Sequence, residues 1–163
     1  MNILGIVPAR GGSKGIKHKN LADCAGKPLV CWTLDAITQS KLITYSVLSS
    51  DDKNILALAS GKNLAMRRPP ELAEDWTPTE AVFSHVLDGL EPVPDIIVLL
   101  QPTSPIRTGK QIDEAIQLLM EMEYDSVLSV VPSHAFLWWQ RVAEPPRVSY
   151  DYKHRPRRQE LPP

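Results

Sequence analysis

The chain has 163 residues, with 18 lysine and arginine side chains against 19 aspartates and glutamates, and a formal net charge of −1 at pH 7. This length suits one domain with a sizeable core rather than two. The near-neutral balance argues against a dedicated nucleic-acid-binding protein, which usually carries a strong basic excess, and no apolar run approaches the ~20 residues that a membrane-spanning helix needs.

The first half of the chain alternates between apolar runs and amphipathic stretches. Residues 3–7 are continuously apolar, which is typical of a buried parallel strand. Residues 29–40 can form a helix, and residues 45–48 predict a second strand. Another helix is expected after this strand. Asp51 or Asp52 would serve as its N-cap, a role that we favour over a metal-binding pair because adjacent carboxylates point apart in an extended segment.

The second half of the chain continues the alternation as far as residue 131. Residues 79–90 have the periodicity of an amphipathic helix, and residues 96–100 are the clearest candidate for a central strand. A further helix is expected around residues 112–119. Residues 126–131 predict one more strand. After that point the periodic pattern ends.

This order of elements predicts a three-layer α/β/α fold with a mostly parallel sheet, Rossmann-like in its winding, over residues 1–131. Residues 132–163 are expected to form an irregular arm, a dimerisation segment cut short. The loop at Arg10 and the segments 49–52 and 101–107 all follow predicted strands. Because parallel strands end at one edge, and ligands bind at that edge, we expect the three segments to converge on one crevice.

The loop after the first strand carries the strongest chemical signal. Residues 8–15 read Pro-Ala-Arg-Gly-Gly-Ser-Lys-Gly. Glycines let backbone N–H groups gather around an anion, and Arg10, Lys14 and Lys19 add positive charge. The loop therefore predicts a cradle for the phosphates of a nucleoside triphosphate. It matches neither the Walker pattern nor G-x-G-x-x-G, and an ordinary surface turn with scattered lysines is the competing interpretation.

Four segments, in the same order, resemble the acylneuraminate cytidylyltransferases, the CMP-sialic acid synthetases: residues 8–20, 68–75, 100–107 and 158–162. The resemblance implies the glycosyltransferase-A-like nucleotidyltransferase fold and transfer of a cytidylyl group from CTP to a nonulosonic acid, with release of pyrophosphate. It further implies a homodimer and Mg²⁺ bound mainly through the CTP phosphates. The chain resembles a C-terminally shortened member, without the late carboxylates that hold the metal in the family, so no metal ligand is expected here.

The resemblance also assigns site residues. Arg10 and Lys19 are the expected catalytic residues, because charge on the α-phosphate and on the departing pyrophosphate has to be neutralised. The expected nucleotide-binding residues are Arg10, Gly11, Gly12, Ser13, Lys14, Lys19, Asn20, Arg68 and Thr79. The expected sugar-acid-binding residues are Gln101, Thr103, Arg158 and Gln159, among which the arginine offers a guanidinium fork that suits a carboxylate.

Several alternatives remain open at this point. Asn20 could simply form a turn, Arg68 could belong to a plain charged loop, and Thr79 could simply begin a helix. The chain could bind nucleotide without turnover, or it could be a ketodeoxyoctonate cytidylyltransferase. A third possibility is an interaction module whose basic run, residues 153–158, binds acidic partners or RNA, although the whole-chain charge argues against it.

The cysteines and the N-terminal residues bear on location. Cys24 and Cys31 fit neither a zinc motif nor a disulfide framework, so two reduced thiols are expected. Met1 and Asn2 supply no basic region before the first apolar run, which is itself too short for a secretory leader. We therefore expect a cytoplasmic protein with no membrane partner.

Overall fold

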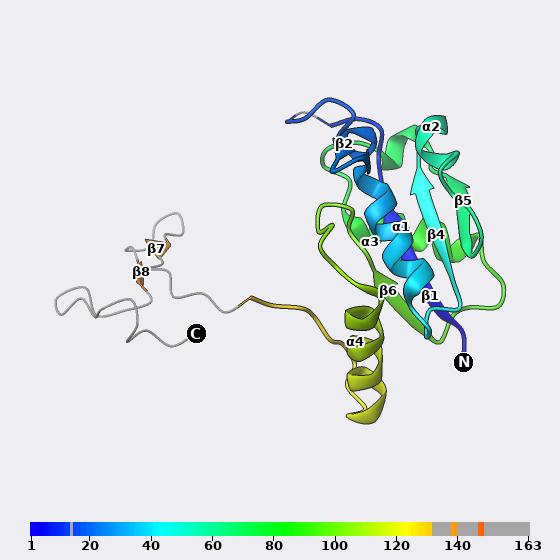
Figure 1. Ribbon diagram of the computed structural model, residues 1–163, viewed down its shortest axis with the longest axis vertical. Coiled ribbons are helices and arrows are strands. Elements are labelled where there is room, and N and C mark those ends of the chain that lie inside the picture. Colours follow the sequence, from blue (N-terminus) through cyan, green and yellow to red (C-terminus); the bar gives the residue numbers. More distant parts are fainter. Residues whose placement is uncertain (14, 132–137, 140–146, 149–163) are drawn as a thin grey trace. The chain divides into compact units, whose positions relative to one another are not determined.

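The computed structural model describes residues 1–13, 15–131, 138–139 and 147–148, and the chain divides into two units, Met1–Val127 and Leu128–Pro163 (Figure 1). In the second unit, the short strands β7 (Trp138–Trp139) and β8 (Arg147–Val148) pair antiparallel. The first unit holds the main sheet and its helices. The domain boundary predicted after residue 131 stays a prediction.

The main sheet of the first unit has four strands in the order β5-β4-β1-β6, and all three strand pairs are parallel. These strands are β1 (Ile3–Pro8), β4 (Tyr45–Ser50), β5 (Asn63–Arg67) and β6 (Ile96–Leu99). A small antiparallel pair is formed by β2 (Asp23–Cys24) and β3 (Lys27–Pro28).

Helices cover both faces of the sheet, so the predicted three-layer arrangement with a parallel sheet is confirmed. Helix α1 lies over one face and α3 behind the other (Figure 1). The helices are α1 (Leu29–Gln39), α2 (Lys53–Leu56), α3 (Thr79–Asp88) and α4 (Gly109–Glu121), and two 3₁₀ helices lie at Lys19–Leu21 and Pro70–Leu72.

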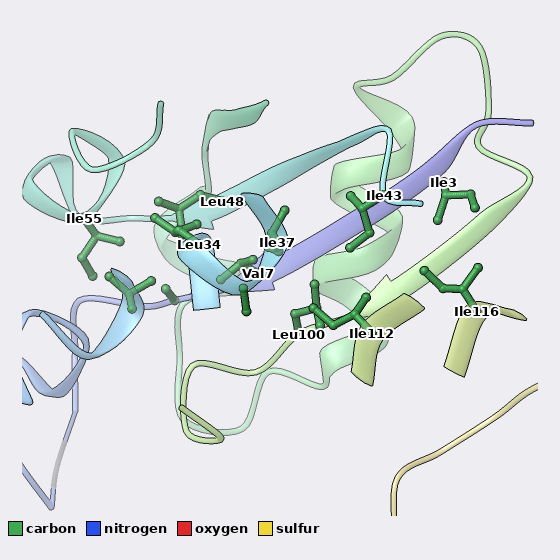
Figure 2. Packing of buried hydrophobic residues seen from close by; sticks show 13 residues of the cluster. Ile3, Val7, Leu34, Ile37, Ile43, Leu48, Ile55, Leu100, Ile112 and Ile116 are labelled. Carbon is green, nitrogen blue, oxygen red and sulfur yellow. The ribbon is translucent and has the colours of Figure 1, made fainter. Parts of the chain in front are cut away.

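Side-chain alternation along β1 builds the two cores. Ile3 and Val7 point toward α1 and α4 and join the larger buried cluster drawn in Figure 2, whereas Leu4 and Ile6 point toward α3. This is the period-2 pattern of a strand that is buried on both faces. Burying each such aliphatic side chain contributes about 1.5–3 kcal/mol relative to leaving it in water.

Two strand predictions differ from the structure, one in the position of the strand and one in its existence. Residues 96–100 were expected in the centre of the sheet, but β6 is an edge strand, and Ile97 and Leu99 are 38% and 40% exposed. Residues 126–131 were expected to form a strand but lie outside any strand in the structure, with Leu128, Val130 and Val131 more than 70% exposed. A strand needs a hydrogen-bonded partner, and no described residue pairs with this segment.

Helix α4 docks on the C-terminal end of α1 through Asp113. The Ser40 hydroxyl donates to Asp113 Oδ1 at 2.6 Å, and the Lys41 and Leu42 N–H groups donate to the same carboxylate at 3.0 and 3.1 Å. Desolvation by itself raises the pKa of Asp113, but these three hydrogen bonds and the charge of Lys62 outweigh it, so the pKa lies below its ordinary value.

We expect Asp113→Asn to destabilise the protein at pH 7 and to have a progressively smaller effect as the pH falls below about 3.9. A carboxyl whose pKa is lowered by folding stabilises the fold above its unfolded pKa of about 3.9, and this contribution is lost as the pH falls through the lower folded pKa. Urea unfolding of parent and variant across this range measures the difference. Glu114→Gln, on the exposed face of the same helix, is the matched control. A gap between parent and D113N that does not change with pH would contradict the expectation.

Candidate functional site

A cavity of about 340 Å³ opens at the carboxyl end of the sheet, next to the ends of β1 and β6. Four segments form its walls: the loop after β1, the stretch from β5 to α3, the first turns of α3, and the loop after β6. Its lining residues are Pro8, Arg10, Ser13, Lys19, Asn20, Arg68, Leu72, Glu74, Asp75, Thr77, Thr79, Val82, Gln101, Pro102 and Thr103. The expected convergence therefore holds for the loops after β1 and β6, whereas residues 49–52 lie behind the wall.

The loop after β1 is held by hydrogen bonds from two directions. The Gly11 N–H donates to Asp51 Oδ1 at 2.9 Å, and the Asn20 side-chain amide donates to the Arg10 carbonyl oxygen at 2.8 Å. Asn20 is only 5% exposed. The loop backbone at Arg10 and Gly11 is thus fixed before any ligand arrives, which favours tight binding because little ordering is left to be done.

Glycine is required at position 11 because the neighbouring chain lies very close. A Cβ added at Gly11 would lie 2.8 Å from the Cβ of Asp52, whereas one added at Gly12 would meet nothing within 4 Å. Asp52 is itself fixed, because its carboxylate accepts a hydrogen bond from the Asn54 N–H at 2.8 Å and caps α2. The capping interpretation of this aspartate is confirmed.

Arg68 forms the rear wall of the cavity and is only 4% exposed. Its guanidinium donates to the Ser49 carbonyl at 2.7 Å, to the Ser49 hydroxyl at 3.2 Å and to the Leu72 carbonyl at 3.3 Å. Burial lowers the pKa of Arg68, the Asp51 carboxylate opposes this, and the charge of Arg10 adds to it. The idea of a plain charged loop is therefore wrong for Arg68, which ties the end of β4 to the segment that follows β5.

One cation of the pocket, Arg10, is paired with a carboxylate. Arg10 Nη2 lies 2.6 Å from Asp75 Oδ1, and the two side chains are 32% and 31% exposed. Glu74 lines the cavity beside Asp75. Neither carboxylate was expected in the site from the sequence. The available signal was their place in the second resembling segment, residues 68–75.

The loop after β6 presents Gln101 and Thr103 to the cavity. Arg107 closes this loop on itself, because its Nη2 donates to the Gln101 carbonyl at 2.9 Å and to the Ser104 carbonyl at 3.3 Å. Burial lowers the pKa of Arg107. Pro102, Pro105 and this guanidinium together restrict the conformations of the loop that presents the Gln101 amide.

The cavity brings together most of the residues expected from the sequence: Arg10, Ser13, Lys19, Asn20, Arg68, Thr79, Gln101 and Thr103. Thr79 both begins α3 and lines the cavity. Gly11 and Gly12 belong to the same loop without lining it. Lys14, Arg158 and Gln159 lie outside the described residues. The roles of all these residues as ligand contacts stay predictions.

Two further features concern metals and membranes. Within the described part of the chain, no group of three or more His, Cys, Asp or Glu side chains is placed to hold a metal ion. None of the helices in that same part is long and apolar enough to cross a bilayer.

A parallel α/β sheet with a cavity at the carboxyl ends of its strands is the arrangement in which open α/β proteins bind ligands, and the cations that line this cavity suit an anionic one. Comparison with known families is more specific, because residues 4–139 match the model of the family described as cytidylyltransferase. The chain belongs to the cytidylyltransferase family.

Three curated relatives illustrate the similarity. The chain is 36% identical over 139 residues to N-acylneuraminate cytidylyltransferase A of Danio rerio, and 35% identical over 134 residues to N-acylneuraminate cytidylyltransferase of Escherichia coli O18:K1:H7. These matches cover 84% and 81% of this chain but only 32% of each relative. A 37% match to CMP-N,N'-diacetyllegionaminic acid synthase of Legionella pneumophila covers 81% of this chain and 59% of the relative. The chain thus spans about a third of the length of the first two.

Solved structures support the fold. A CMP:2-keto-3-deoxy-manno-octonic acid synthetase complexed with CTP superimposes with a TM-score of 0.62 at 21% identity, covering 74% of this chain and 48% of that one. A 4-diphosphocytidyl-2C-methyl-D-erythritol synthase of Anaerococcus prevotii gives 0.61 at 17% identity, covering 98% and 65%. A Mycobacterium tuberculosis protein in complex with manganese gives 0.55 at 18% identity, covering 72% and 59%.

Proposed function

We propose that the chain functions as a cytidylyltransferase that joins CTP to a nonulosonic acid of the sialic type, giving the CMP-sugar and pyrophosphate. One observation carries the proposal: a single cavity collects Arg10, Ser13 and Lys19 from the loop after β1 and faces them with Gln101 and Thr103 from the loop after β6. The first group suits phosphates, and the second offers an amide and a hydroxyl to a polar sugar. The names of the curated relatives point to the same substrates.

In the proposed reaction, the 2-hydroxyl oxygen of the nonulosonic acid attacks the α-phosphorus of CTP. A new P–O bond forms, the bond between the α-phosphorus and the oxygen that bridges to the β-phosphate breaks, pyrophosphate leaves with that oxygen, and the hydroxyl proton passes to solvent. The Arg10 and Lys19 side chains would neutralise the charge that develops on the α-phosphate and on the leaving group. Preorganised cations of this kind supply much of the acceleration in phosphoryl chemistry. Ser13 would add a hydroxyl donor, and the backbone N–H groups of Gly12 and Ser13 would add amide donors.

The remaining lining residues divide between the two substrates. Asn20 and Thr79 would adjoin the cytidine half, although the amide nitrogen of Asn20 already holds the loop. Arg68 would act on CTP through its charge and by shaping the wall, since its guanidinium donates to Ser49 and Leu72. Gln101 and Thr103 would contact the sugar acid. Arg158 and Gln159 are proposed to contact the sugar acid as well, with Arg158 facing its carboxylate.

Within the described residues, no group of three or more His, Cys, Asp or Glu side chains is placed to hold a metal ion. Mg²⁺ is proposed only as the ion that accompanies the CTP phosphates. Homodimerisation is proposed from the sequence resemblance alone. Cytoplasmic location is proposed because Cys24 and Cys31 are both free thiols, as is usual in a reducing compartment.

Calorimetry with CTP and Mg²⁺ tests the proposal. We expect saturable binding by the parent and about a tenfold loss of affinity in Arg10→Ala, because charge-assisted hydrogen bonds contribute about 1.5–3 kcal/mol each. Lys17→Ala is the matched control, since Lys17 is an exposed cation on the same loop that does not line the cavity. Absence of CTP binding by the parent, or equal behaviour of R10A and K17A, would overturn the proposal.

A second candidate function is nucleotide binding without turnover, because the cations that line the cavity suit phosphates whether or not a reaction follows. A pyrophosphate-release assay with CTP, Mg²⁺ and N-acetylneuraminic acid separates the two. Steady release, lost in R10A, supports the enzyme. CTP binding with no release supports the binding module.

A further inference from the structure

We infer that Asp75 is a specificity-determining residue of the pocket. In the structure its carboxylate binds Arg10, so a ligand competes with it for the donors of the Arg10 guanidinium. The inference rests on the proposed function, in which Arg10 contacts the CTP phosphates. It adds a competing group that neither the sequence nor the comparisons assign.

The ion pair lies within the cavity. Arg10 Nη2 and Asp75 Oδ1 are 2.6 Å apart, and both residues line the same 340 Å³ space as Ser13 and Lys19. The two partners come from different walls, the loop after β1 and the segment that precedes α3. The pair therefore closes part of the space that the phosphates of CTP would occupy.

The backbone and the side chain of Arg10 differ in how they are held. The Arg10 backbone is fixed, because its carbonyl accepts a hydrogen bond from the buried Asn20 amide. The freedom of Arg10 is thus confined to its side chain, which can turn from the carboxylate to a phosphate without moving the loop.

The strength of the ion pair decides which ligands can displace the Asp75 carboxylate from Arg10. About a third of each side chain is exposed, so solvent screens the pair and its contribution is at the modest end for ion pairs. A triphosphate offers several anionic oxygens at once and forms strong, often bidentate bonds with arginine, so it displaces the carboxylate. CMP carries only the α-phosphate, so it offers fewer anionic oxygens and competes less well with the carboxylate for Arg10. Asp75 thereby makes the use of Arg10 depend on the number of phosphates in the ligand.

Calorimetric titration of parent, Asp75→Asn and Glu74→Gln with CTP, CMP and inorganic tripolyphosphate tests the inference. Glu74→Gln is the matched control, because it removes the same charge from the same cavity. We expect D75N to bind CTP and tripolyphosphate about three- to fivefold more tightly, the range set by the loss of one partly exposed ion pair. E74Q should change either affinity by less than about twofold, and neither variant should alter CMP binding by more than that.

The other outcomes are also decisive. Weaker CTP binding by D75N would mean that Asp75 orients Arg10 toward the ligand, which overturns the inference. If E74Q also bound CTP more tightly to the same extent, or if D75N bound CMP more tightly to the same extent, the gain would come from removing a negative charge anywhere in the cavity. Either result would overturn the inference as well. A parent that binds tripolyphosphate but not CTP would contradict the proposed function while leaving the D75N comparison intact. If the parent binds neither anion, tripolyphosphate binding gained only in D75N supports the inference, and no gain overturns it.

A double-mutant cycle gives an independent check. In an Arg10→Ala background, Asp75 has lost the guanidinium for which it competes. D75N should then change tripolyphosphate affinity no more than E74Q does in the same background. An undiminished three- to fivefold gain would show that Asp75 acts on the ligand without Arg10, and the inference would fail.

Discussion

Replacing Gly109 by alanine is expected to lower the free energy of unfolding by about 3 kcal/mol, at the upper end for overpacking of a tight contact. Gly109 is the first residue of α4 and is buried against the end of α1. A Cβ added there would lie 2.6 Å from both the Gln39 carbonyl carbon and the Ser40 nitrogen. These are backbone atoms, so relief requires one helix to move away from the other rather than a rotamer change.

Urea unfolding of the parent and Gly109→Ala measures this loss, with Gly15→Ala as the matched control. A Cβ at Gly15 would meet nothing within 4 Å. Movement of α4 would also shift Thr108, which caps it, and with it the loop that carries Gln101. We therefore expect reduced CTP-dependent turnover in any folded G109A protein. Equal unfolding midpoints for the two alanine variants would contradict the close approach of α1 and α4.

The elements best predicted from the sequence are those whose signal is local. The continuous apolar run at 3–7 became β1, and the expectation that Asp51 or Asp52 would cap the next helix is met by Asp52 at α2. Both depend on nearest neighbours along the chain, namely burial on two faces and the orphan N–H groups of a first helical turn.

Strand order is a different kind of property. The run at 96–100 is as apolar as a central strand, yet β6 lies at the edge with β1 as its one partner in the sheet. Conversely, β5 was not expected, because residues 63–67 begin with Asn63 and end with Arg67 and are not a continuous apolar run. In the structure Leu64 of this strand is 48% exposed. Pairing is decided by contacts distant in sequence, and composition of a single segment does not encode them.

The same distinction applies to the site. The cations Arg10 and Lys19 flank a glycine-rich turn, so the local sequence alone indicates an anion site. The partner of Arg10 comes from residue 75, on a separate wall of the cavity. Nothing local marks Asp75 as that partner. Likewise, Arg68 was expected as a ligand contact, but the three hydrogen bonds that hold it inside the wall depend on where β4 ends.

Replacing Arg68 by lysine is expected to cost about 3 kcal/mol of stability, although the charge is kept. The guanidinium reaches the Ser49 and Leu72 carbonyls at once, and a single ammonium cannot span both from a buried position. At least one buried carbonyl then loses its donor, at about 1–3 kcal/mol, and the cation loses part of what compensates its burial.

The charge-conserving variant also separates two ways in which Arg68 could act on CTP. If Arg68 contributed only its positive field, R68K would bind CTP like the parent and Arg68→Met would not. Because its hydrogen bonds hold the end of β4 against the segment at Leu72, we expect R68K to lose about tenfold in CTP affinity, nearly as much as R68M. Arg67→Lys, at the exposed neighbouring position, is the control for both readouts. Parent-like affinity and stability in R68K would show that the wall is held by other contacts and that Arg68 acts through charge alone.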